Sequence, residues 1–348
     1  MSDHINVQHS GEQRRSKSEA PAVMIGVVNY NRHTDTIECL KSLLSCSYPN
    51  KELVVFDNGS QDDSVQRIRD AFPSLTILES KKNLGAAGAR NEVIRWARNR
   101  KPDYLLVIDN DTVVEREFLQ PLVDAMENDP EAAVACGTIL EFDRRDVIWF
   151  GGGKLVPLRG LALHKRVGER FYRERESGPQ QVSYITVCMT LYRCSLLERV
   201  GLQDERYFVY LEDIEFAARL HKQGYKQLYV PASVIYHKVR GERDSTFKLY
   251  YCVRNRMLLT REGFGGLTGT FATVYFLVVI VMKLAVWGVL RRDFYVAAKA
   301  GLVDYFKGNF GEGRGTIMFA DARTRISNSD KSVAKKGILV SAIEVRHL

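Results

Sequence analysis

The chain has 348 residues, of which 45% are hydrophobic and 26% are charged. These values are ordinary for a folded protein, so a wholly disordered chain is excluded, and the length accommodates one catalytic domain plus an appendage. The six cysteines form no C-x-x-C pair and show no zinc-ligand spacing, so we expect buried or free thiols in a reducing cytoplasm.

The formal net charge of +8 lies entirely in the C-terminal third of the chain. Residues 241–348 carry 17 Lys and Arg against 9 Asp and Glu, whereas residues 1–240 carry 33 of each kind. A local basic surplus of this size calls for an anionic partner, which could be lipid, glycan or nucleic acid.

Residues 1–21 are polar and contain no apolar run, so we expect a disordered leader without a signal peptide. After them, short apolar runs alternate with amphipathic stretches. The first four expected strands are Val23–Val28, Leu53–Phe56, Leu75–Leu78 and Tyr104–Ile108. Strands that alternate with helices through short links predict an α/β fold with a mostly parallel, doubly wound (Rossmann-like) sheet flanked by helices.

Polar side chains follow three of these strands, at Asn29, Asp57 and Asp109. Ligands of open α/β sheets bind at the carboxyl ends of the strands, so this edge is the expected binding site. A carboxylate there can accept hydrogen bonds from a base or a ribose. Arg90, near the start of a helix, can meet a diphosphate through charge-assisted hydrogen bonds.

Asp109 and Asp111 end the Tyr104–Ile108 run as an Asp-Asn-Asp sequence. On an extended chain, side chains two residues apart point to the same side, so the two carboxylates would converge. Mg²⁺ or Mn²⁺ would suit such a pair and would take further ligands from water and a substrate diphosphate. A simple polar turn after a strand is the alternative.

Two nucleotide-binding motifs are absent from the sequence. Gly85-Ala86-Ala87-Gly88 lacks the spacing of a dinucleotide-binding loop, and no G-x-x-x-x-G-K-[ST] phosphate loop occurs. An ATPase is therefore not expected.

The second half of the chain is less regular. We expect strands at Val134–Leu140, Val182–Tyr192 and up to His237, a solvated basic loop at His164–Arg175, and helices from Glu212 and over Phe247–Arg261. The acidic residues that begin the first of these helices are also favoured by the helix dipole alone.

Leu267–Leu290 contains one charged residue, Lys283, and is followed directly by Arg291 and Arg292. The segment is long enough to span a bilayer, but its glycines and Lys283 weaken that interpretation. We expect, in this order, an interfacial or shallowly inserted helix, a membrane span, or a core helix. Residues 320–348 are expected to form a basic tail.

Four motifs occur in order along the chain. They are Val27-Val28-Asn29-Tyr30-Asn31, Val55-Phe56-Asp57-Asn58-Gly59-Ser60, Asn83-x-Gly85-x-x-x-x-Arg90-Asn91 and Ile108-Asp109-Asn110-Asp111. Together they resemble the successive motifs of glycosyltransferase family 2, and in particular its bacterial rhamnosyltransferase-like members. The resemblance extends from about Val23 to about Arg261. It implies a GT-A domain at residues 22–262. From the apolar and basic residues that follow, we expect a helical appendage at 263–319 that associates with membranes, and then the tail.

The resemblance also implies roles for individual residues. Asp213, in the Glu212-Asp213 pair, matches the catalytic base of the family, and Glu215 stands where many relatives have Asp. The implied nucleotide-sugar contacts are Asn29, Asp57, Asn83, Arg90 and Asp109. The implied metal ligands are Asp109, Asp111 and His237, although a structural role for His237 is equally open. Glu212 and Arg254 are possible supports of the acceptor site.

The expected function is inverting, metal-dependent transfer of one sugar from dTDP-rhamnose or a UDP-hexose. The acceptor would be a hydroxyl of a lipid-linked or polysaccharide molecule at the cytoplasmic membrane face, in cell-surface glycan synthesis. No Q-x-x-R-W motif of the processive relatives is present, which favours single additions. We expect an anionic membrane surface as a partner and no nucleic acid, and an oligomer is possible.

Two alternatives remain. A nucleotidyltransferase should have a Gly- and Arg-rich loop after its first strand, whereas Asn29-Tyr30-Asn31-Arg32 lacks the glycines. A non-catalytic relative should have a broken site, whereas Asp109, Asp111 and Asp213 are all present.

Overall fold

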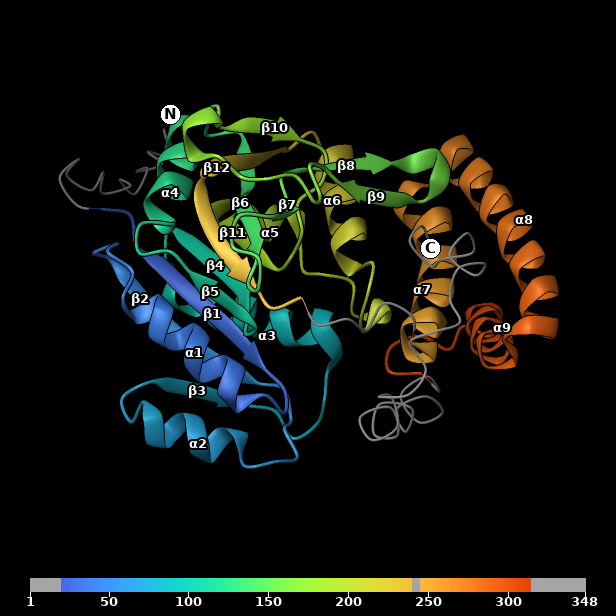
Figure 1. Ribbon diagram of the computed structural model, residues 1–348, viewed down its shortest axis with the longest axis horizontal. Helices are drawn as coiled ribbons and strands as arrows, with labels where there is room; N and C mark the ends of the chain where they lie inside the picture. Colours follow the sequence, from blue (N-terminus) through green and yellow to red (C-terminus); the bar gives the residue numbers. More distant parts are fainter. Residues whose placement is uncertain (1–19, 240–244, 314–348) are drawn as a thin grey trace, which may run out of the picture.

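The structure, a computed structural model, describes residues 20–239 and 245–313. Within these ranges the main sheet has the strand order β10-β12-β6-β11-β4-β1-β2-β3 (Figure 1). The strands on this path are β1 (Val23–Asn29), β2 (Lys51–Asp57), β3 (Thr76–Glu79), β4 (Tyr104–Asp109), β6 (Ala132–Glu141), β10 (Gln180–Val182), β11 (Met189–Arg193) and β12 (Lys226–His237). Two short strands join it from the side, β5 (Thr112–Val114) on β12 and β7 (Ile148–Phe150) on β6.

The predicted α/β fold is confirmed, and its sheet is mixed, with β5, β7, β10 and β11 antiparallel to their neighbours. Strands β3, β2, β1 and β4 run parallel, and so do β6 and β12. Only β11 separates the two groups, because it pairs antiparallel with both β4 and β6. A separate hairpin is formed by β8 (Gly153–Val156) and β9 (Leu161–His164).

Helices pack against this sheet. The helices of the sheet region are α1 (His33–Leu44), α2 (Ser64–Ala71), α3 (Gly85–Arg100), α4 (Leu119–Asn128), α5 (Cys194–Val200) and α6 (Glu212–Lys222). Of these, α3 packs on β1 and β4, while α4 and α6 pack on β12.

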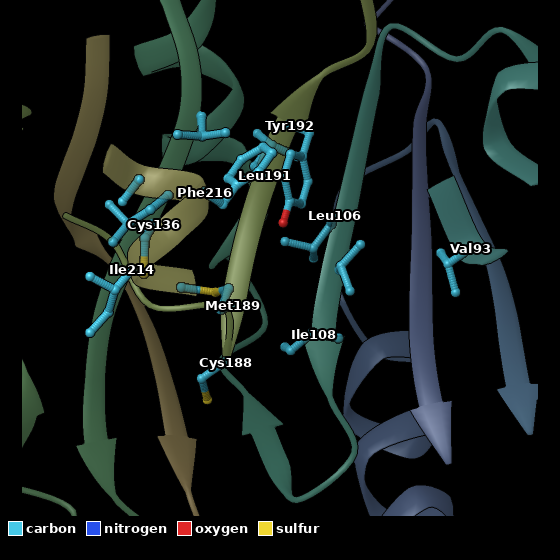
Figure 2. Close-up of a cluster of buried hydrophobic side chains, with 14 of the residues drawn as sticks. Val93, Leu106, Ile108, Cys136, Cys188, Met189, Leu191, Tyr192, Ile214 and Phe216 are labelled. Atoms are coloured by element: carbon cyan, nitrogen blue, oxygen red, sulfur yellow. The ribbon is translucent and has the colours of Figure 1, made fainter. Parts of the chain in front are cut away.

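Figure 2 shows a part of the buried core where β11 lies beside β4. Leu106 and Ile108 of β4 and Met189 and Leu191 of β11 are completely buried. A strand covered on both faces needs a nearly continuous apolar run, which explains the Tyr104–Ile108 pattern. Each fully buried side chain of this size contributes about 1.5–3 kcal/mol to folding.

The expected single strand at Val182–Tyr192 is instead two strands, β10 and β11, which pair with different neighbours. Between them the chain bends at Thr186, whose hydroxyl accepts the Cys188 amide N–H (3.4 Å) and whose carbonyl accepts the Thr190 hydroxyl (3.0 Å). These local hydrogen bonds replace ladder bonds, so one long strand was the wrong prediction.

The C-terminal helices lie on the side of the molecule away from β2 and β3 (Figure 1). They are α7 (Thr246–Leu258), a π-helical turn (Leu259–Phe264), α8 (Gly266–Leu290) and α9 (Arg292–Phe306). Helix α9 packs back on α7, where the Tyr250 hydroxyl donates to Asp304 (2.6 Å) and a Cβ at Gly301 would meet the Tyr250 carbonyl at 2.6 Å. The expected domain boundary at 262 therefore falls inside the π-helical turn.

Helix α8 is the one helix among the described residues that is long and apolar enough to cross a membrane. Its most apolar stretch has a mean hydropathy of 2.2, yet only 17% of that stretch is buried. Its exposed apolar side chains are Leu267, Phe271, Val274, Tyr275, Val278, Val281, Met282, Val286, Val289 and Leu290. This exposure disfavours the core-helix interpretation.

The expected leader and tail fall almost entirely outside the described residues, as do residues 314–319 of the appendage. The end of the leader is described, and it is bonded to the loop between α1 and β2. The carbonyl of Pro21 accepts the Tyr48 hydroxyl at 2.7 Å, and the carbonyl of Ala20 accepts the Asn50 amide at 2.8 Å.

Candidate active site

Asn29 and Asp57 lie side by side at the ends of β1 and β2, as the strand pattern predicts. The Asn29 amide donates to Asp57 Oδ1 (2.7 Å), and the Thr36 hydroxyl donates to Asn29 Oδ1 (2.6 Å). Asp57 also accepts the amide N–H and the hydroxyl of Ser60. Both side chains are buried, so in this structure they shape the two loops that border the sheet edge.

Asn83 joins this edge to the start of α3. Its Oδ1 accepts the Asn58 amide (2.9 Å) and the Gly85 N–H (2.8 Å), while Asn58 Oδ1 accepts the Leu84 N–H (2.8 Å). Sequence reasoning did not single out Asn58, which ties the end of β2 to α3. Gly85 has φ +74° and a Cβ there would lie 2.4 Å from the Phe208 carbonyl oxygen, so only glycine fits.

Arg90, expected to face a diphosphate, is buried between two carboxylates in this structure. Its Nη2 donates to Asp109 Oδ1 (3.0 Å) and its Nη1 to Glu212 Oε1 (2.7 Å). Burial alone would lower the pKa of Arg90, but the two carboxylates raise it overall. Arg90 therefore connects the end of β4, at the expected donor edge, with the start of α6.

Glu212 and Asp213 are adjacent carboxylates with different surroundings. Glu212 is 4% exposed, and burial raises its pKa to about 7 although Arg90 opposes the shift. Asp213 is half-buried, accepts the Tyr184 hydroxyl on Oδ2 (2.6 Å) and accepts the Ile214 N–H on Oδ1 (2.8 Å). Burial also raises the pKa of Asp213, while Tyr184 and Arg90 limit the rise. Of the two carboxylates, Asp213 is therefore the one that solvent reaches.

Asp111 and His237 meet, although they are far apart in the sequence. Strand β4 ends at Asp109, a turn follows, and β5 then pairs with the end of β12 so that Thr112 opposes His237. His237 Nε2 lies 3.2 Å from Asp111 Oδ1, and Arg32 lies 3.5 Å from Asp111 Oδ2. Burial alone would raise the pKa of Asp111, but the bond to His237 and the charge of Arg32 lower it overall.

This geometry differs from the expected metal site, in which the carboxylates of Asp109 and Asp111 converge on an extended strand. Because residues 110 and 111 form a turn, Asp109 and Asp111 do not follow each other along an extended strand, and Asp109 faces Arg90. Asp111 and His237 are adjacent carboxylate and imidazole donors, which suit Mn²⁺, and His237 Nδ1 is a buried nitrogen without a partner among the described residues. These two side chains fit a divalent cation, and Asp109 lies at the strand end beside them.

The Glycosyl transferase family 2 model matches residues 24–201. The chain belongs to glycosyl transferase family 2. This result opposes the nucleotidyltransferase alternative. The matched residues include Asn29, Asp57, Arg90, Asp109 and Asp111, but end before Asp213 and His237.

Two relatives support this family. The chain is 27% identical over 208 residues to an N-acetylglucosaminyl-diphospho-decaprenol L-rhamnosyltransferase of Mycobacterium tuberculosis, covering 54% of this chain and 67% of that protein. It is 24% identical over 208 residues to a poly-beta-1,6-N-acetyl-D-glucosamine synthase of Staphylococcus aureus, covering 59% of this chain and 47% of that one. The chain thus spans about half the length of the second relative.

The fold is that of GT-A glycosyltransferases. The crystal structure of GalNAc-T7 with UDP, GalNAc and Mn²⁺ superposes with a TM-score of 0.55 at 16% identity, covering 77% of this chain and 58% of that one. At this identity the likeness concerns the fold alone.

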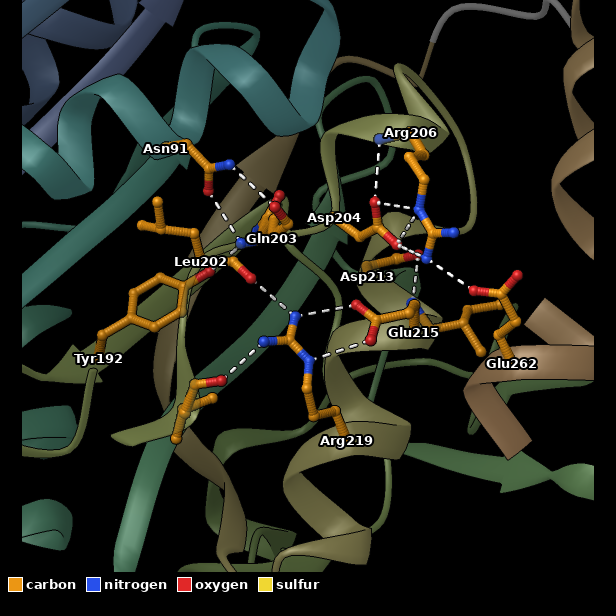
Figure 3. Close-up of polar contacts among 12 residues, drawn as sticks. Asn91, Tyr192, Leu202, Gln203, Asp204, Arg206, Asp213, Glu215, Arg219 and Glu262 are labelled. Carbon is orange, nitrogen blue, oxygen red and sulfur yellow. Dashed lines mark hydrogen bonds and ion pairs between the residues drawn. The ribbon is translucent and has the colours of Figure 1, made fainter. Parts of the chain in front are cut away.

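Two further charged side chains of this family 2 glycosyltransferase, Arg254 and Glu215, are bonded within the protein. Arg254 is completely buried and donates to backbone carbonyls rather than facing an acceptor. Glu215 is bonded to Arg219 of the same helix, which in turn donates to the carbonyls of residues 200 and 202 (Figure 3). Both residues therefore have structural partners.

Another possible cation site lies among the His, Cys, Asp and Glu side chains of residues 20–239 and 245–313. The one group of three whose ligand atoms all lie within 4.8 Å of one another consists of His33, Asp62 and Asp63. The two aspartates are exposed, and sequence reasoning did not select this cluster. Exposed acidic groups of this kind are common without a bound ion.

Proposed function

We propose that the chain is an inverting, metal-dependent glycosyltransferase that moves a single sugar from a nucleotide diphosphate sugar to an acceptor hydroxyl. The observation that carries this proposal is the Asp109–Arg90–Glu212 ion pair chain. It brings the carboxyl edge of the sheet, where ligands of such folds bind, next to a half-buried carboxylate, Asp213.

On the donor side, the edge formed by Asn29 and Asp57 would accept the nucleoside. Asp111 and His237, with Asp109 beside them, would hold Mg²⁺ or Mn²⁺. Such a cation, when bound, neutralises the negative charge that develops on the departing diphosphate.

On the acceptor side, Asp213 would remove the hydroxyl proton while the hydroxyl oxygen attacks the anomeric carbon from the face opposite the diphosphate. A new C–O bond forms as the bond to the diphosphate breaks, the proton ends on Asp213, and the configuration inverts. Tyr184, whose hydroxyl donates to Asp213, would hold this carboxylate in its orientation.

The names of two relatives support the proposed donor and acceptor classes. The mycobacterial relative is named a rhamnosyltransferase acting on a decaprenol-linked sugar, and the staphylococcal relative is named a polysaccharide synthase. We therefore place the reaction in cell-surface glycan synthesis, with dTDP-rhamnose or a UDP-hexose as donor and a lipid-linked or polysaccharide acceptor.

A donor screen tests this function. Purified full-length protein with Mn²⁺ is expected to bind dTDP-rhamnose or one UDP-hexose, because a diphosphate and a cation bind a carboxylate edge together. The measurement is isothermal calorimetry, followed by mass spectrometry of the acceptor products. Binding of free nucleoside triphosphates with release of pyrophosphate would instead indicate a nucleotidyltransferase, and no binding of any sugar nucleotide would indicate a non-catalytic relative.

Membrane docking at the cytoplasmic face is the second part of the proposal. The exposed apolar side of α8 can enter the acyl boundary, while Arg291 and Arg292 directly after it stay with anionic headgroups. Each such cation contributes about 1 kcal/mol near an anionic surface. Docking would keep the Asp213 site close to a lipid-linked acceptor.

Liposome flotation tests the docking. Full-length protein is expected to float with anionic liposomes at low salt. The double variant Phe271→Glu, Val278→Glu should not, because both side chains lie on the exposed face of α8. Leu44→Glu is the matched control, since Leu44 is a half-exposed apolar residue on α1. Salt-sensitive binding favours an interfacial helix and carbonate-resistant binding favours a span. If the unmodified protein does not float, the helix serves another purpose, such as an oligomer interface.

A further inference from the structure

The loop of residues 206–211 leads directly into Glu212 and Asp213, and its backbone is unusual. Phe208, Tyr210 and Leu211 have φ angles of 62°, 67° and 69°. Residues other than glycine rarely adopt positive φ angles, and such a backbone persists only where the surroundings determine it. Something other than the loop's own sequence must therefore hold it.

Every carbonyl of this loop accepts a hydrogen bond. The Phe208 carbonyl accepts the Ala86 N–H at the start of α3 (2.6 Å), and the Leu211 carbonyl accepts the Glu215 N–H (3.0 Å). The other four carbonyls are bound by two neighbouring side chains of α7, Arg254 and Asn255, which we name the α7 clamp.

Asn255 makes most of these bonds. Its Nδ2 lies 2.8 Å from each of the carbonyl oxygens of Tyr207, Val209 and Tyr210. Its Oδ1 accepts Arg254 Nε (3.0 Å), which turns the amide nitrogen toward the loop. An amide buried without partners would be costly, so this set of bonds fixes both the clamp and the loop.

Arg254 extends the clamp in two directions. Its Nη2 donates to the carbonyls of Arg206 (3.2 Å) and Tyr207 (3.1 Å), and its Nη1 donates to the Gly311 carbonyl (2.8 Å). The Gly311 N–H returns a bond to the Arg206 carbonyl (2.9 Å). The segment after α9 is therefore bonded directly to the start of the loop.

We propose that Arg254 and Asn255 are positioning residues for the transfer reaction. By fixing the loop, the α7 clamp sets the start of α6, so that Asp213 meets Tyr184 and Glu212 meets Arg90. Because Gly311 is bonded to Arg254 and to Arg206, residues 304–313 also help to fix the loop before Asp213, in addition to any role in membrane attachment. The inference rests on the proposed function, since it requires Asp213 to be the base.

The chain offers a matched control for this proposal. Asn91 on α3 is, like Asn255, completely buried and bonded to a nearby loop. Its amide donates to the Gln203 carbonyl (2.9 Å) and to Glu205 (2.8 Å), and its oxygen accepts the Gln203 N–H (2.9 Å; Figure 3). None of these contacts of Asn91 reaches the loop of residues 206–211. The variants Asn255→Asp and Asn91→Asp remove the same donors without leaving a cavity.

The experiment measures kcat and donor KM per folded molecule, with dTDP-rhamnose or the UDP-hexose that the protein accepts, and hydrogen exchange of residues 206–213. In Asn255→Asp we expect kcat to fall on the order of 100-fold, because small displacements of a reacting group cost that much. Donor KM should stay within about twofold, since the clamp makes no donor contact. Exchange of the loop should become faster. Asn91→Asp should lower the thermal stability about as much as Asn255→Asp does. It should nevertheless leave kcat and the hydrogen exchange of the loop nearly unchanged.

The proposal is overturned if Asn255→Asp keeps its kcat or its loop exchange, or if Asn91→Asp changes both as strongly. Should Asn255→Asp fail to fold, Arg254→Lys, which retains the charge but reaches fewer carbonyls, replaces it in the same comparison. A wild-type protein that transfers no sugar contradicts the proposed function, whereas unchanged loop exchange contradicts the α7 clamp itself.

Discussion

Asp213→Asn is expected to abolish sugar transfer and to leave donor binding nearly intact. An amide cannot accept the acceptor proton, and general-base catalysis contributes about 10²–10⁴-fold to the rate. The donor contacts that we propose lie at the ends of β1, β2 and β4, so a substitution on α6 should not weaken them. The measurement is kcat with the preferred donor, together with calorimetry of donor binding.

Glu212→Gln is the control for this variant. It is equally conservative and removes the neighbouring carboxylate, which is bonded to Arg90 and is almost inaccessible. We expect a smaller loss of kcat than in Asp213→Asn. If Glu212→Gln were the inactive variant and Asp213→Asn kept its turnover, Glu212 would be the base. If Asp213→Asn lost donor affinity instead of turnover, Asp213 would be a donor ligand.

The pH dependence of the transfer rate follows from the burial of Asp213. The base must be deprotonated, so activity is lost as the pH falls through the pKa of Asp213. Burial raises that pKa above the ordinary value of 3.8. The acidic limb of the rate profile should therefore lie at a higher pH than for an exposed aspartate.

Sequence reasoning succeeded where the signal is local. The apolar runs predict β1, β2 and β4, and the parallel register then places Asn29 beside Asp57 without further information. The partner of Arg90 was not predictable in this way. Glu212 lies 122 residues further along the chain, and only the packing of α3 against the start of α6 brings the two together.

The role of Asn255 illustrates a different limit. Its partners are backbone carbonyls, which carry no sequence signature, and α7 shows only that the residue is in a buried helix. The positive φ angles of the 206–211 loop could not be expected from its sequence either, because Phe208, Tyr210 and Leu211 are not glycines. The one available signal was an Asn in a helix that the fold buries, since buried amides need partners.

The turn after β4 separates Asp109 and Asp111, which were expected from the sequence to converge. The expectation of convergent carboxylates assumed an extended chain through Asp111, whereas the chain turns after Asp109. The approach of His237 depends on the pairing of β5 with β12, which is a tertiary feature. The sequence therefore predicts neither the turn at residues 110 and 111 nor the approach of His237 to Asp111.

Asp111→Asn is therefore expected to remove the metal dependence of donor binding and with it the transfer. Metal binding should weaken by about 100-fold or more, because a ligand that carries a charge is lost. Calorimetry of Mn²⁺ with the donor measures this. Thermal unfolding gives a second measurement that needs no activity, since a ligand that binds only the folded state raises Tm. Mn²⁺ with donor should raise Tm in the wild type but not in Asp111→Asn.

Asp63→Asn is the matched control, because Asp63 belongs to the exposed cluster with His33 and Asp62. It should keep both the Mn²⁺-dependent rise in Tm and the transfer activity. Asp111→Asn also removes the partner of His237 and Arg32, so its Tm without metal is expected to be lower than that of the wild type. The relevant quantity is thus the shift on adding Mn²⁺. If Asp63→Asn loses that shift and Asp111→Asn keeps it, the cation binds the exposed cluster. If wild-type transfer persists in excess chelator, the reaction needs no divalent cation.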